Sequence, residues 1–330
     1  MTDFIFPWFK DAWTAIHKNE KKPHALIFRG KEGIGKLDFA AKFSKSYLCH
    51  KPLSNHLPCE ICSSCQWFPL THPDFNHIAP IENEDDESSK RKTVRKKNIA
   101  IDQIRELSEY LELSAHQEKG KRIILIEPAD TLNHAASNAL LKILEEPPEN
   151  TLFILVTSQL QKLLPTIRSR CQLLELPAPS FEEARSFLMS KKITHDENLL
   201  SLAGGSPFNV IKESENQLER ETVTKLLSQG HNIDITKVNY AILTHGLDWV
   251  LNLIQKWVFD LLLNFHAQQS YYFKNEEKNI QFQIKQMNLE ALLSYINELN
   301  DLKKIASHPI NQELQLQNIF IKYKQIFEPS

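Results

Sequence analysis

A glycine-rich segment between an apolar run and a helical pattern constrains the fold of this chain more than any other feature of its sequence. Residues 25–28 are continuously apolar, a loop with Gly30, Gly33 and Gly35 follows, and residues 37–48 carry apolar positions at helical spacing. In this context the order Gly-x-x-x-x-Gly-Lys predicts a phosphate-binding loop, because backbone N–H groups and a helix N-terminus then face an anion. We therefore expect a nucleotide-binding type of α/β fold.

The same segment lacks the side chains that ATP hydrolysis needs. The position after Lys36, which should carry the Ser or Thr ligand of Mg²⁺, is Leu37. A later strand at 122–126 should end in an Asp-Glu pair, but Glu127-Pro128 follows it. Glu127 could still hold a cation, whereas a proline can neither accept a proton nor orient water. We expect a degenerate nucleotide site without hydrolysis and leave nucleotide binding open; its residues are Gly30, Gly33, Gly35, Lys36, Leu37 and Glu127.

A short polar stretch holds most of the cysteines. Four cysteines lie within residues 49–65, namely Cys49, Cys59, Cys62 and Cys65. This spacing is typical of a closed, structural four-thiolate zinc site. An iron–sulfur cluster is the alternative, because Cys-x-x-Cys-x-x-Cys also occurs there. The nearby histidines, His50, His56 and His72, are expected to be surface residues rather than ligands.

Composition narrows the possible functions. A length of 330 residues predicts two or three domains, and only 8 glycines and 16 prolines favour a helix-rich chain. The balance of 39 Lys+Arg against 41 Asp+Glu excludes a strongly basic nucleic-acid binder. Apolar runs are shorter than the roughly 18 residues that a membrane helix needs, and the start lacks the order of a signal peptide. We expect a cytoplasmic protein.

The order of apolar segments predicts a parallel sheet. Further strand-like runs lie at 75–81, 122–126 and 152–157, and a helical stretch at 135–146 separates the last two. Alternating strands and helices are typical of parallel α/β architecture. A charged insert at 82–97 breaks this order, and we expect it to be a solvated surface loop.

The second half of the chain reads as helical. Ser180 and Glu183 form a capping box that should start a helix, and residues 204–207 predict a turn before another one. Beyond residue 214 the apolar periodicity is almost wholly helical, strongest at 249–265 and 289–299. Three domains are expected: an α/β domain over 1–178, a small helical domain over 179–213 and a larger helical domain over 214–330.

The segment after the strand at 152–157 contains Arg170 and Cys171. A lone cysteine here is expected to be a small buried hydrophobe. A guanidinium at a domain edge can stabilise phosphate charge in a neighbouring subunit as an arginine finger, or it can make an ordinary surface ion pair. The residues alone leave both open.

Together these segments resemble the AAA+ clamp-loader subunits of bacterial DNA polymerase III. The strings that carry the resemblance cover about half of the chain: residues 24–30 with the glycine loop, the four cysteines, Asn-Ala-Leu-Leu-Lys-Ile-Leu-Glu-Glu-Pro-Pro at 138–148, and Thr-Ile-Arg-Ser-Arg-Cys at 166–171. The resemblance implies an α/β AAA+ domain with a parallel sheet, helices on both faces and a zinc-binding insert. A small helical lid and an all-α collar domain should follow.

Within that family the missing residues favour the non-hydrolysing delta prime branch over the ATPase branch, gamma/tau. An ATPase would also need an arginine after the Gly-Ser turn, where this chain has Pro207-Phe208. The resemblance implies a stator that works with gamma/tau and delta subunits in a hetero-pentamer, which loads the sliding clamp onto primed DNA. Arg170, with Ser169 and Cys171 of its motif, would reach the ATP site of the adjacent subunit.

The resemblance implies no catalysis by the isolated chain, although the assembly it serves is a DNA-directed DNA polymerase, a nucleotidyltransferase. Two other hypotheses stay open at this point. One is a working clamp-loader ATPase in which Glu127 and an unusual metal arrangement rescue hydrolysis. The other is a free-standing module that binds zinc and nucleic acid.

Overall fold

The computed structural model of the chain describes residues 5–18, 23–68, 72–81, 98–112, 120–193, 197–235, 243, 245–305 and 311–327. The chain divides into two compact units, Met1–Glu183 and Ala184–Ser330. The charged insert at 82–97, for which a surface loop was predicted, lies outside the described residues.

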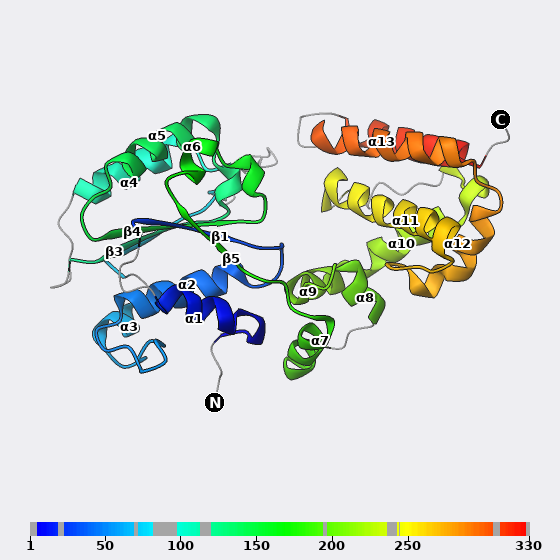
Figure 1. Ribbon diagram of the computed structural model, residues 1–330. Helices are drawn as coiled ribbons and strands as arrows, with labels where there is room; N and C mark the ends of the chain where they lie inside the picture. The colour runs from blue at the N-terminus through cyan, green and yellow to red at the C-terminus, as the bar shows by residue number, and fades with distance from the viewer. Residues whose placement is uncertain are drawn as a thin grey trace, which may run out of the picture. The chain divides into compact units, whose positions relative to one another are not determined.

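A five-stranded parallel sheet with the order β2-β3-β4-β1-β5 forms the centre of the first unit (Figure 1). β1 lies between β4 and β5, with Ile27 in register with Leu155 and Leu173. β3 and β4 are buried along their whole length, as the apolar runs predict for parallel strands covered on both faces. The strands are β1 Ala25–Arg29, β2 Phe75–Ile78, β3 Arg122–Ile126, β4 Thr151–Thr157 and β5 Gln172–Glu175.

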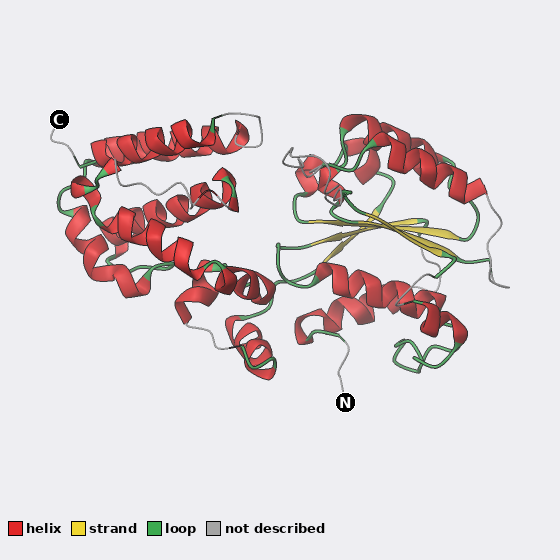
Figure 2. Ribbon diagram, turned by 180° about the vertical axis from the view of Figure 1, so that it is seen from behind, coloured by secondary structure: helices red, strands yellow, loops and turns green. Residues whose placement is uncertain are grey.

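Helices cover both faces of this sheet (Figures 1 and 2). One layer contains α1 Lys10–Lys18, α2 Lys36–Leu48 and α3 Ser63–Trp67, and the other α4 Ile101–Glu112, α5 His134–Glu145 and α6 Pro165–Arg168. An aromatic cluster packs under the first layer, where the ring of Phe39 meets Phe9, Trp13 and Phe28 edge to face. The predicted α/β architecture is confirmed.

All regular secondary structure in the described part of the second unit is helical. They are α7 Phe181–Ser190, which starts at the boundary, α8 Glu197–Leu202, α9 Pro207–Glu215, α10 Gln217–Ser228, α11 Leu247–Ala267, α12 Glu277–Ile284, α13 Leu289–Ile305 and α14 Gln312–Gln325. A small apolar cluster joins α7, α8 and α9, and a much larger one surrounds α11. The division of this half into a small and a larger helical domain stays a prediction.

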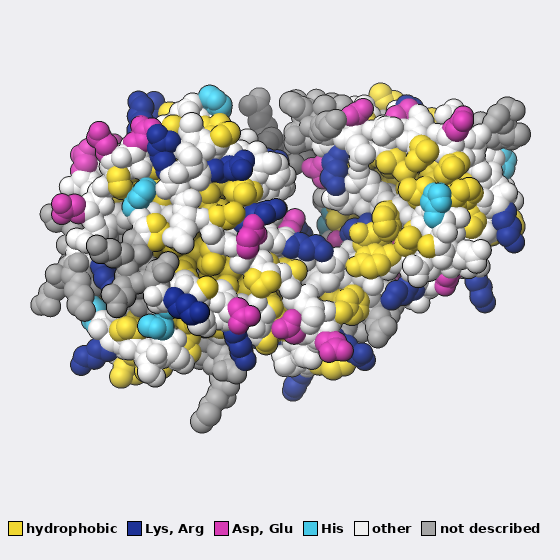
Figure 3. Space-filling view, viewed as in Figure 1, with side chains coloured by type: hydrophobic (Ala, Val, Ile, Leu, Met, Phe, Trp, Pro, Cys, Tyr) yellow, Lys and Arg dark blue, Asp and Glu magenta, His cyan; other side chains and the backbone are white. Residues whose placement is uncertain are grey.

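A buried hydrogen-bond network holds the larger cluster together. The Tyr323 hydroxyl donates to the carbonyl oxygen of Leu227 at 2.9 Å and accepts from Trp257 Nε1 at 2.8 Å. Gln283 Nε2 donates to the same carbonyl at 2.7 Å. Outside this core, the helices of the second unit expose large apolar side chains, among them Phe259, Phe265, Phe282 and Leu293. Hydrophobic side chains also gather on the face of this unit that Figure 3 shows.

Several local predictions can be checked directly. The capping box is present, because the Ser180 N–H donates to Glu183 Oε2 at 2.8 Å and the Glu183 N–H donates to Ser180 Oγ at 3.2 Å. The strand predicted at 75–81 ends earlier, at Ile78, and β5 was not predicted. Within the described residues, no helix is both long and apolar enough to cross a membrane.

Candidate functional site

The glycine loop lies at the carboxyl end of β1 and leads into α2. Gly33 and Gly35 have φ of 74° and 87°, a left-handed conformation that favours glycine. Gly30 is required for a different reason: a Cβ built there would lie 2.7 Å from the Leu176 carbonyl oxygen. Each of the three glycines therefore has a structural reason for its place, and phosphate binding by this loop stays a prediction.

Lys36 is folded back across this loop. Its Nζ donates to the Lys31 carbonyl oxygen at 2.8 Å and to Ser158 Oγ at 2.8 Å, and only 8% of the residue is exposed. Burial lowers the pKa of the Lys36 ammonium, while the carboxylates of Glu32, Glu127 and Asp130 oppose that shift. The cation that would reach a phosphate is thus tied to the loop itself.

Two positions of this site differ from those of a hydrolytic phosphate-binding loop. Leu37 occupies the second position of α2 and is 37% exposed, with no oxygen to offer a cation. Glu127 follows β3. Burial raises the pKa of its carboxyl above the ordinary value, although the nearby Lys36 ammonium opposes this shift. Pro128 comes next, so no second carboxylate stands beside Glu127 in the chain. Asp130 is a further carboxylate whose charge acts on both Lys36 and Glu127, and the lack of hydrolysis stays a prediction.

Asp130 and Ser158 belong to the same site but were not predicted. Asp130 Oδ1 accepts from Thr157 Oγ1 at 2.5 Å and from the Ser158 N–H at 3.2 Å. Asp130 therefore links the segment after β3 to the end of β4, and Ser158 in turn holds Lys36. Their position directly after parallel strands is the signal that could have identified them, because ligand sites form at the carboxyl ends of such strands.

The four predicted metal ligands come together in the insert after α2. Their sulfur atoms all lie within 4.8 Å of one another, with Cys49 to Cys62 at 3.9 Å and Cys59 to Cys65 at 4.0 Å. A tetrahedral ion with metal–sulfur bonds of about 2.3 Å requires sulfur separations of about 3.8 Å. The arrangement can hold a metal ion, and all four cysteines are free rather than disulfide-bonded.

Backbone N–H groups surround these sulfur atoms. Cys59 N–H donates to Cys49 Sγ at 3.3 Å, Cys62 N–H to Cys59 Sγ at 3.4 Å and Cys65 N–H to Cys62 Sγ at 3.5 Å. The N–H of Ile61 is the main cause that lowers the pKa of Cys59 to about 6, whereas burial raises the pKa of Cys49 and Cys65. Such N–H donors favour the thiolate form that metals bind.

His72 corrects one prediction. Unlike the exposed His50 and His56, it is buried, with 5% of its surface exposed. Its Nδ1 accepts from the Asp74 N–H at 3.1 Å and its Nε2 lies 3.0 Å from Ser64 Oγ, next to Cys65. His72 therefore contacts α3 through Ser64 rather than facing solvent. Its polar neighbours in the sequence gave no indication of this burial.

Arg170 lies just after α6, and its guanidinium is held by two elements. Nη2 donates to Glu145 Oε1 at the end of α5 at 2.7 Å, and Nη1 donates to the Thr166 carbonyl oxygen at 3.0 Å. The side chain is 35% exposed. The next residue, Cys171, packs against the core, and burial raises the pKa of its thiol to about 12, as fits a small hydrophobe.

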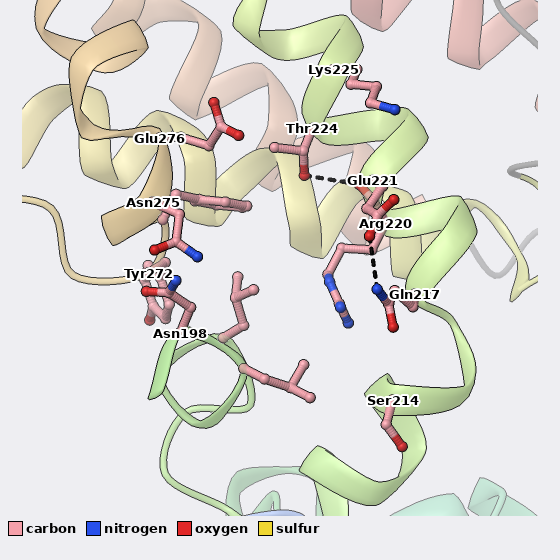
Figure 4. A pocket seen from close by; sticks show the side chains of 13 residues that line it. Asn198, Ser214, Gln217, Arg220, Glu221, Thr224, Lys225, Tyr272, Asn275 and Glu276 are labelled. Carbon is pink, nitrogen blue, oxygen red and sulfur yellow. Dashed lines mark hydrogen bonds between the residues drawn. The ribbon is translucent and has the colours of Figure 1, made fainter. Parts of the chain in front are cut away.

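A hollow of about 490 Å³ lies in the second unit between α8, α10 and the segment before α12 (Figure 4). Arg220 and Lys225 on α10 bring positive charge to it, and Glu221 and Glu276 bring negative charge. Gln217 Nε2 donates to Glu221 Oε1 at 2.8 Å, so one carboxylate is already bonded. The lining has no excess of either sign and does not select the charge of a ligand.

Comparison with known proteins gives one consistent result. Residues 7–180 match the profile of the family described as DNA polymerase III, delta subunit. DNA polymerase III subunit delta' of Pseudomonas aeruginosa is 35% identical over 237 residues, which cover 68% of each chain. The Escherichia coli subunit of that name is 31% identical over 68% of this chain and 65% of its own, and that of Buchnera aphidicola subsp. Schizaphis graminum is 29% identical over 97% of both.

Proposed function

The chain belongs to the DNA polymerase III delta-subunit family, and from this membership we propose that it is a delta prime type of clamp-loader subunit, a stator that supports loading of the sliding clamp on primed DNA. The observation that carries the proposal is a phosphate loop that keeps its backbone but lacks its catalytic side chains. Leu37 replaces the metal ligand and Pro128 the residue that orients the attacking water, so this chain does not hydrolyse ATP itself.

We further propose that Arg170 acts in trans. Its guanidinium lies on the surface of the first unit, with part of its donor capacity unused by Glu145 and Thr166. An arginine supplied by one subunit stabilises the charge that develops on a phosphate held by another. The ATPase neighbour would be a gamma/tau subunit, and Ser169 and Cys171 would set the turn from which Arg170 projects.

The cysteine cluster is proposed to hold one structural Zn²⁺. Four thiolates at these separations match its tetrahedral preference, and a closed four-thiolate shell leaves no position for substrate. The ion would link the end of α2 to α3, whose first residues follow Cys62. Bound there, zinc supplies folding energy rather than catalysis.

The partners follow from the same proposal. Gamma/tau and delta subunits would complete a hetero-pentamer in the cytoplasm, and the clamp and DNA would be reached through that assembly. The exposed apolar side chains of α11, α12 and α13 are available for a collar contact (Figure 3). The near-neutral total charge, -2, agrees with DNA contact made mainly through partners.

Two assays test the proposal. The purified chain should not hydrolyse Mg-ATP above a blank, and in a loader assembled with its own gamma/tau and delta subunits, Arg170→Ala should lower DNA-stimulated ATP turnover. Arg168→Ala is the matched control, because Arg168 lies on the same turn and makes no ion pair with the described residues. Hydrolysis by the isolated chain that Lys36→Ala abolishes would identify a working ATPase instead. Salt-dependent DNA binding by the isolated chain would identify a nucleic-acid module.

A further inference from the structure

We propose that Glu145 is a positioning residue for Arg170, which fixes one edge of the guanidinium so that its other donors face a phosphate of the adjacent subunit. The inference rests on the function proposed above for Arg170. It adds a second residue, on a different helix, that acts on the neighbour's reaction only through the arginine.

The contacts restrict the guanidinium at two places. Glu145 Oε1 accepts from Nη2 at 2.7 Å, and the Thr166 carbonyl oxygen accepts from Nη1 at 3.0 Å. The backbone under Arg170 is fixed as well, because its N–H donates to the Ile167 carbonyl oxygen at 3.1 Å. A long side chain that would otherwise sample many rotamers is thereby confined to one region.

Enough hydrogen-bonding capacity remains for an anion. A guanidinium has five N–H donors, and the bonds to Glu145 and Thr166, with a long contact to Ser169 Oγ at 3.5 Å, use only part of them. The Arg170 side chain is also 35% exposed, so a phosphate can reach it. Confining the side chain beforehand reduces the entropy that is lost when the phosphate is engaged.

The place of Glu145 in its helix supports the pairing. It is the last residue of α5, and a carboxylate is unfavourable at a helix C-terminus, where the helix dipole is negative. Arg170 brings the compensating positive charge to that end. Glu146, the next carboxylate, is also exposed but makes no ion pair with the described residues, so the pairing is specific to the first of the two glutamates.

The opposite effect is also chemically conceivable, because a carboxylate could hold the arginine back from the phosphate. The sign of one substitution separates the two. If Glu145 positions Arg170, removing its charge lowers turnover; if it withholds Arg170, removing the charge raises turnover. The pair is half exposed, so either effect is limited to about two- to fivefold.

The test uses the loader assembled from this chain and its own partner subunits, with Glu145→Gln and, as the matched control, Glu146→Gln. We expect Glu145→Gln to lower DNA-stimulated ATP turnover about two- to fivefold, with the KM for ATP and the melting temperature of the chain unchanged, and Glu146→Gln to match the wild type. In an Arg170→Ala loader, Glu145→Gln should cause no further loss. A merely structural glutamate would add to that loss and lower the melting temperature.

The outcomes separate this inference from the proposed function. If Arg170→Ala itself leaves turnover unchanged, the arginine-finger proposal fails. If Arg170→Ala lowers turnover while Glu145→Gln leaves it unchanged or raises it, the finger stands and the positioning role of Glu145 is wrong. An equal loss from Glu145→Gln in the presence and absence of Arg170 would also overturn the inference.

Discussion

The glycine loop and the cysteine insert are neighbours in the chain, joined by α2. They differ in whether the backbone or the functional side chains of the site are present. The loop has glycines in the left-handed conformation at two positions, whereas Leu37 and Pro128 stand where a hydrolytic site would carry a metal ligand and a water-orienting base. The insert keeps all four ligand side chains on a backbone with little core of its own, and it exposes Leu53 and Ile61.

The difference shows what maintains each site. The loop is also a packing joint: Gly30 lies against Leu176, Trp8 Nε1 donates to the Ile34 carbonyl oxygen at 3.0 Å, and Lys36 connects the loop to Ser158. These contacts would preserve its shape without any ligand. The insert is also tied to its surroundings, because Trp13 Nε1 donates to the Asn55 carbonyl oxygen at 3.1 Å and Lys42 Nζ donates to Glu60 Oε1 at 2.9 Å. Its contacts are mainly polar, so we expect its structure to depend in addition on what the cysteines bind.

Cys65→Ser should have the largest effect. It removes a buried ligand, and we expect loss of the bound metal together with a fall of about 4 kcal/mol or more in the unfolding free energy of the metal-loaded chain. Metal content and urea unfolding measure the two effects. The matched control is Cys171→Ser, which removes the fifth cysteine, outside the cluster, and should leave about one equivalent of metal bound. A Cys65→Ser chain with full metal content and wild-type stability would contradict the proposed zinc site.

Gly30→Ala should have a smaller effect, on the packing of the loop. The new Cβ would lie 2.7 Å from the Leu176 carbonyl oxygen and 2.8 Å from Ile34 Cδ1, so strand β1 and the segment after β5 must move apart. Overpacking of this kind costs about 1–3 kcal/mol, measured by urea unfolding. Gly205→Ala is the comparison for overpacking. A Cβ there meets nothing within 4 Å, so any loss of stability in that variant comes from its φ of +78° and not from a clash. Unchanged stability in Gly30→Ala would mean that the loop is not the rigid joint described above.

The sequence predicted those features that depend on apolar periodicity or on residue spacing. β1, β3 and β4 were predicted because buried parallel strands read as continuous apolar runs. The spacing of the four cysteines predicted that they lie together, as their sulfur atoms do, and the capping box predicted the start of α7. β5 escaped prediction because its four residues are mostly exposed at the sheet edge and carry no such run.

The contacts of the site were less predictable, because they join residues far apart in the sequence. Nothing near Lys36 indicates that Ser158 accepts from it, or that Asp130 bonds the end of β4. The pairing of Glu145 with Arg170 joins two segments that the sequence marked separately. Local patterns specify elements and spacings, whereas the partner of a side chain follows from sheet order.

Lys36→Met should have the smallest effect on the unfolding free energy. It tests whether the loop lysine stabilises the fold. The change removes the hydrogen bonds to Lys31 and Ser158 and should lower stability by about 1–2 kcal/mol at pH 8. Burial lowers the pKa of Lys36 below the ordinary value of a lysine, so between the two values the unfolded chain binds more protons than the folded chain. The contribution of Lys36 to stability therefore rises with pH in that window, and the stability difference between wild type and Lys36→Met should grow from pH 8 to pH 10.5. Urea unfolding at both pH values measures it. A wild-type advantage that shrinks with pH would mean that the ammonium is stabilised, not penalised, at this site.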